Sequence, residues 1–103
     1  MKATLLVHHE EILLNGKYVV TVTVYSVDQS KKFPDGIKAK FLLQTEEGIA
    51  KLLIDNHQPY GFHMHTQLPH NHSHREILDV KDYQEAMDFF FEEVGRIVKN
   101  EEA

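Results

Sequence analysis

Six of the chain's eight histidines fall in one short segment, and their spacing is the first sign of chemistry in this sequence. They are His57, His63, His65, His70, His72 and His74. In an extended chain, residues two positions apart point to the same side, with Cα atoms roughly 6.6 Å apart. Pairs such as His63 and His65 can therefore reach one metal ion or one phosphate group.

One use of this spacing is a metal site, because neutral imidazole is a good ligand for zinc, nickel and copper ions. The candidate ligands are His57, His63 and His65, completed by a carboxylate of Asp55, Glu76 or Asp79. The chain has neither a helical His-Glu-x-x-His pattern nor a Cys/His framework, so the spacing is not specific for a metal. This alternative describes a non-catalytic module that binds Zn or Ni, or one that binds another protein.

A second use is proton transfer on a phosphodiester, which requires no cofactor. RNA can be cleaved without a metal when one group removes the 2′-hydroxyl proton and another protonates the departing 5′-oxygen. Two histidines can share these roles, each contributing about 10²–10⁴ in rate. The phosphate charge requires a cation, and Lys40 and Arg75 are the candidates for binding the substrate.

Some of these histidines and lysines also have simpler, non-catalytic interpretations. The histidines of a solvated polar loop can also cap turns and bond locally, without any chemistry. His8 and His9 are adjacent in an expected strand, so they face opposite ways and cannot both serve one site. Several lysines could form a basic face or simply keep a sheet edge soluble; they are Lys31, Lys32, Lys38, Lys40 and Lys51.

The composition limits the class of protein. A chain of 103 residues is expected to form one domain over 1–103. The absence of cysteine excludes disulfides, thiolate metal sites and cysteine nucleophiles. With no signal-like start and no apolar run of membrane length, we expect a cytoplasmic protein. The net charge of −5 argues against broad nucleic-acid binding, although histidine protonation near pH 6 would offset much of it.

The first half of the chain reads as strands that would position these residues. Asn15-Gly16 lies between apolar runs and predicts a two-residue type I′ turn between strands at about 3–14 and 17–27. Two further strands are expected at 37–44 and 49–55, with Lys38 and Lys40 facing outward from the first of them.

The last part of the chain predicts a helix at about 80–99, with Asp79 as its N-cap. Its apolar stripe would cover the sheet, and Phe89 lies off that stripe, where it either packs under the neighbouring loop or contacts a partner. The expected fold is α+β: an antiparallel meander of four to five strands with one C-terminal helix on a face. The sheet would span about 3–55 and a His-rich loop 56–75, and a fifth strand, if present, would include 75–78.

The order of motifs resembles the TumE-like toxins of prokaryotic type II toxin–antitoxin systems. The segments IDNHQPYGFHMH, REIL and MDFFFEEV follow one another as in that family. The positions that match its pattern are Asp55, Asn56, Gly61, His63, His65, Glu76, Asp88 and Phe89. The resemblance implies a toxin encoded beside a helix-turn-helix antitoxin, inhibiting growth by acting on RNA or translation.

Together, these patterns lead to one expected site. His63 and His65 would form an acid/base pair, with positioning by Asp55, Asn56 and Glu76. The activity would be that of a metal-independent ribonuclease. Phe89 would contact the antitoxin or a second subunit, and a hydrophobic sheet edge could pair across the axis of a homodimer.

Overall fold

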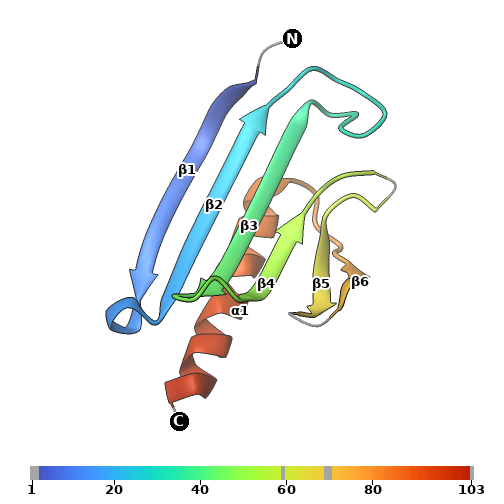
Figure 1. Cartoon of the computed structure of the whole chain (residues 1–103). Coiled ribbons are helices and arrows are strands. Elements are labelled where there is room, and N and C mark those ends of the chain that lie inside the picture. The colour runs from blue at the N-terminus through green and yellow to red at the C-terminus, as the bar shows by residue number, and fades with distance from the viewer. Residues whose placement is uncertain (1–2, 59, 69–70, 103) are drawn as a thin grey trace.

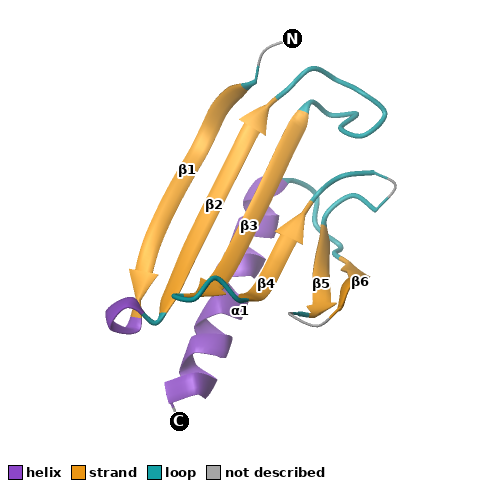
Figure 2. Ribbon diagram, in the orientation of Figure 1, coloured by secondary structure: helices purple, strands orange, loops and turns teal. Residues whose placement is uncertain are grey.

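The computed structural model describes residues 3–58, 60–68 and 71–102, and its strands form a single antiparallel meander in chain order (Figure 1). One helix crosses a face of this sheet (Figure 2). The α+β class is confirmed, but the sheet has six strands rather than four or five. The elements are β1 (Thr4–Leu13), β2 (Tyr18–Ser26), β3 (Ile37–Thr45), β4 (Ala50–Asp55), β5 (His63–Gln67), β6 (Asn71–Ile77) and α1 (Tyr83–Glu102).

The first hairpin contains the predicted turn. Asn15 has φ 56° and ψ 37° and Gly16 has φ 96°, the left-handed values of a type I′ turn. The Lys17 amide donates to the Leu14 carbonyl at 3.2 Å. Leu14 also has a positive φ of 51°, so the ladder ends one pair earlier than expected, at Leu13 and Tyr18.

Alternation along the central strands separates an apolar face from a polar one. Ala39, Phe41 and Leu43 of β3 are buried against the helix, while Lys38 and Lys40 are exposed on the opposite face, as predicted. The buried helix residues are Ala86, Phe90 and Val94. Because α1 covers only one face, the polar face of β3 and β4 is left for a site.

The helix begins later than the sequence predicts. Its N-cap is Asp82, whose Oδ1 accepts the Glu85 amide at 2.9 Å, while a Glu85 carboxylate oxygen accepts the Lys81 amide at 3.1 Å. The prediction of Asp79 as the cap was wrong, because the helix begins at Tyr83 and the side chain of Asp82, directly before it, accepts an amide of the first turn. Within the described ranges, no helix is long and apolar enough to cross a membrane.

The predicted His-rich loop over 56–75 is largely a hairpin, formed by β5 and β6. The strand expected at 75–78 exists, but it begins at Asn71 and ends at Ile77. Met64 is the apolar residue of β5, and the other residues of this strand are polar. The segment therefore lacks the apolar alternation of a typical strand, and it was predicted as a loop. The pairs Ile54–Met64 and Asp55–His63 join this hairpin to β4.

Candidate functional site

The site lies on the sheet face opposite α1, where β3, β4 and β5 are neighbours. Lys40 is paired with Asp55 across β3 and β4, and Asp55 is paired with His63 across β4 and β5. Residues directly opposite in antiparallel strands point to the same side. Ile54, next to Asp55, is fully buried in the apolar core, so Asp55 and His63 point away from the helix.

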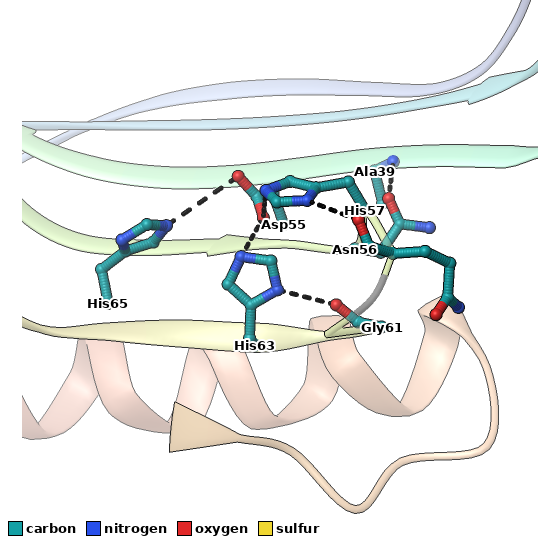
Figure 3. Close-up of polar contacts among 8 residues, drawn as sticks. Ala39, Asp55, Asn56, His57, Gly61, His63 and His65 are labelled. Atoms are coloured by element: carbon teal, nitrogen blue, oxygen red, sulfur yellow. Dashed lines mark hydrogen bonds and ion pairs between the residues drawn. The ribbon is translucent and has the colours of Figure 1, made fainter. Parts of the chain in front are cut away.

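His63 is the most enclosed member of the site, with 0% of its surface exposed. Its Nδ1–H donates to the Gly61 carbonyl at 2.7 Å, and its Nε2 lies 2.5 Å from Asp55 Oδ1 (Figure 3). Gly61 has φ +64°, a conformation that L side chains rarely adopt, and this turn aims its carbonyl at the ring. Burial lowers the pKa of His63, against the opposing effects of the Gly61 carbonyl and Asp55. The neutral imidazole is therefore favoured.

His57 approaches the same carboxylate from the connection between β4 and β5. Its Nδ1–H donates to the Gln58 carbonyl at 3.2 Å, and its Nε2 lies 3.8 Å from Asp55 Oδ1. Because a carbonyl only accepts, this bond places a proton on Nδ1, and the neutral ring then has its lone pair on Nε2. The side chain is 27% exposed, which makes His57 the accessible imidazole beside Asp55.

His65 lies on the other side of the carboxylate, with its Nε2 3.9 Å from Asp55 Oδ2. It is nearly buried and is paired with Arg75 across β5 and β6. The Arg75 guanidinium lies 4.5 Å from the centre of the Tyr60 ring, and that ring is 5.3 Å from the ring of His63. Tyr60 was missed by the sequence analysis, because no motif marks an aromatic residue that covers a histidine.

Two of the expected positioning residues have different places. Asn56 is buried; its Oδ1 accepts the Ala39 amide at 2.9 Å and its Nδ2 donates to the Ile37 carbonyl at 2.9 Å. Its amide group is therefore occupied in attaching the segment to β3. Glu76 is exposed and paired with Met64, so strand alternation points it away from His63 and the structure does not bring it into the site.

The remaining expected residues lie outside the cluster. Phe89 is partly buried and packs against the apolar core, and its role as a partner contact stays a prediction. His70 and the side chain of His72 are outside the described residues, and His74 is exposed on β6. Among the described residues, Asp55 is the carboxylate that groups with two histidines at metal-ligand spacing.

A pocket of about 140 Å³ opens beside His57 and Asp55. It is smaller than the roughly 300–1,000 Å³ of sites for drug-sized ligands, and suits a group of phosphate size. Its lining residues are Lys32, Phe33, Lys38, Ala39, Lys40, Asp55, Asn56 and His57. The three lysines form no ion pair with any residue in the described part of the chain, so the pocket has an excess of positive charge.

No family model, curated protein or solved structure matches this chain.

Proposed function

We propose that this chain acts on RNA as the toxin of a toxin–antitoxin pair, with the phosphodiester bound in the lysine pocket and His57 transferring a proton. The observation that carries the proposal is the pocket itself, where three lysines surround an opening next to an accessible imidazole and a carboxylate. The resemblance to TumE-like toxins adds the expected partner, a helix-turn-helix antitoxin.

The lysine pocket supplies a local attraction for RNA, which the negative net charge of the whole chain does not. With a net charge of −5, the protein as a whole repels RNA. Lys32, Lys38 and Lys40 all line the pocket, so in this proposal their flexible side chains supply the cations that a bound phosphate would contact. Three such contacts on a single strand correspond to a slope of about −2 in a plot of log affinity against log salt concentration.

Proton transfer falls to His57 because its imidazole is accessible. Its bare Nε2 can take the 2′-hydroxyl proton while the 2′-oxygen bonds to phosphorus and the bond from phosphorus to the 5′-oxygen breaks. Solvent water protonates the departing 5′-oxygen, and the imidazolium of His57 would lie beside the negative charge of Asp55, 3.8 Å away. His63 has no exposed surface, so in this proposal it does not touch the substrate. His63 and His65 instead flank Asp55, each with its Nε2 near one carboxylate oxygen, at 2.5 Å and 3.9 Å.

The role of the pocket can be tested with two adjacent lysines. Lys32 lines the pocket, whereas Lys31 is exposed and does not. Lys32→Ala is expected to weaken binding of a single-stranded RNA oligonucleotide about fivefold, and to reduce the salt slope by about 0.7. Lys31→Ala should leave both values close to those of the wild type.

Fluorescence anisotropy of a labelled RNA over a series of salt concentrations measures both quantities. Equal affinity and equal salt slope for the wild type and both variants would contradict a phosphate site in this pocket.

A further inference from the structure

Three potential ligand atoms meet at one point of the site. An oxygen of Asp55 and one ring nitrogen each of His57 and His63 all lie within 4.8 Å of one another. A carboxylate with two imidazoles is a common ligand set for divalent transition metals. Without cysteine in the chain, the available donors are nitrogen and oxygen, which suit zinc or nickel better than copper(I).

The buried polar atoms of the cluster lack hydrogen bonds. Asp55 Oδ1 and His63 Nε2 are 2.5 Å apart, a contact that is an ion pair when His63 is protonated. Within the described structure neither atom has another hydrogen-bond partner. With the Nδ1 proton of His63 donated to Gly61, the neutral ring presents a lone pair to a negatively charged oxygen. Two buried acceptors facing each other are unfavourable unless a proton or a metal ion lies between them.

The backbone fixes both rings in the form that a metal requires. The carbonyls of Gly61 and Gln58 accept the Nδ1 protons of His63 and His57, so that both Nε2 atoms are bare and turned to Asp55. A metal-bound histidine usually donates its other ring N–H to a carbonyl or carboxylate in this way, which orients the ring and raises its basicity. Both histidines therefore already have the second contact that a ligating histidine needs.

The distances from Asp55 Oδ1 to the two ring nitrogens can be compared with those of a tetrahedral site. Ligand atoms about 2.0–2.1 Å from zinc are roughly 3.3 Å apart in a tetrahedron. The two contacts with Asp55 Oδ1, at 2.5 Å and 3.8 Å, fall on either side of that value. Small movements of the side chains would be sufficient to bind an ion.

We infer that Asp55, His57 and His63 bind one divalent transition-metal ion, with zinc as the expected ion. Three protein ligands leave a fourth position open for water or a ligand. Two of the three, Asp55 and His57, also line the lysine pocket. His65 approaches the other oxygen of Asp55 and is outside the three-atom group.

This inference goes beyond the proposed action on RNA and does not depend on it, because binding is measured on the protein alone. The two uses of His57 exclude each other. A bound ion would occupy the Nε2 lone pair that the proton transfer uses, so any RNA cleavage should decrease as the metal site fills.

The test uses untagged protein treated with a chelator and then titrated with zinc in competition with a chromophoric chelator. We expect one zinc ion per chain for the wild type and for His74→Ala, which changes an exposed histidine outside the cluster. His57→Ala and Asp55→Asn are expected to weaken this binding at least tenfold. Circular dichroism checks that each variant is folded.

Equal zinc affinity of the wild type and His57→Ala would overturn the inference, because the ion would then bind elsewhere in the chain. Failure of the wild type to bind one equivalent would overturn it as well. If Asp55→Asn does not fold, His57→Ala decides the outcome, because the side chain of His57 is partly on the surface.

Discussion

Asp55 is the residue on which the site is centred. One of its oxygens faces His57 and His63, and the other faces His65. A carboxylate in this position can hold three rings in place, stabilise an imidazolium, or bind a cation together with two of them. Which of these occurs depends on which ring nitrogens of the three histidines are protonated, and therefore on pH.

The pKa of His63 gives the stability of the metal-free protein a defined pH dependence. In the folded state, burial lowers the pKa of His63 below the ordinary value of 6.5, which this residue keeps in the unfolded chain. As the pH falls through 6.5, the unfolded chain takes up the proton first, so the folded state loses stability until the lowered pKa is passed. This contribution is fully present above about pH 7.

We therefore expect the free energy of unfolding to fall more steeply between about pH 7.5 and pH 5.5 in the wild type than in His63→Gln, whose side chain does not titrate. Urea denaturation in the presence of EDTA measures both profiles. The comparison concerns their slopes, because the substitution also changes packing. Parallel profiles would show that His63 titrates alike in the folded and unfolded chains.

Much of the residue-level site could be predicted from spacing and motif. The two-residue interval identified His63 and His65, and the Asp-Asn pair identified Asp55. The face on which a residue points depends on strand register, which spacing alone does not provide. For that reason Glu76 was expected in the site and is not there, while Tyr60 was missed.

The connection between β4 and β5 is the element that brings His57 to Asp55. Backbone pairing of β3 with β4 ends at Lys40 and Asp55, and the Asn56 side chain then takes over. The Asn56 Oδ1 accepts the Ala39 amide, and the Asn56 Nδ2 donates to the Ile37 carbonyl. These are backbone groups of β3 that lie beyond the last pair with β4. A side chain thus continues the ladder where β4 stops and fixes the chain at the position just before His57.

Asn56→Ala is expected to lower the free energy of unfolding by about 2–4 kcal/mol, because it leaves the Ala39 amide and the Ile37 carbonyl buried and unpaired. Gln58→Ala, at an exposed position of the same connection, should change it by less than about 0.5 kcal/mol. Chemical denaturation of the two variants measures the difference. Similar stabilities would mean that the Asn56 side chain does not hold this segment.

The elements differ in how well the sequence predicts them. In β2 and β3, alternation of apolar and polar residues is regular, and both strands were expected at nearly the observed bounds. The β5–β6 hairpin was read as a loop because the segment 56–75 contains two prolines, one glycine and six histidines and has no regular apolar alternation. Its pairing with β4 is a tertiary contact, which overrides local preference.

At the scale of the whole molecule, the helix and the site lie on opposite faces of the sheet. The apolar face is covered by α1, so the polar face of β3 to β5 can carry lysines and histidines without affecting the core. The pocket is lined by three lysines and one carboxylate, Asp55, so its local charge differs in sign from the net charge of −5 of the whole chain. A phosphate bound there would lie directly beside His57.

Cleavage of a labelled single-stranded RNA by purified protein in EDTA tests the proposed function most directly. We expect the wild type and His74→Ala to cleave it, leaving a 2′,3′-cyclic phosphate, and His57→Ala to be slower by about 100-fold. Cleavage by His57→Ala at the wild-type rate, or no cleavage by the wild type, would contradict it.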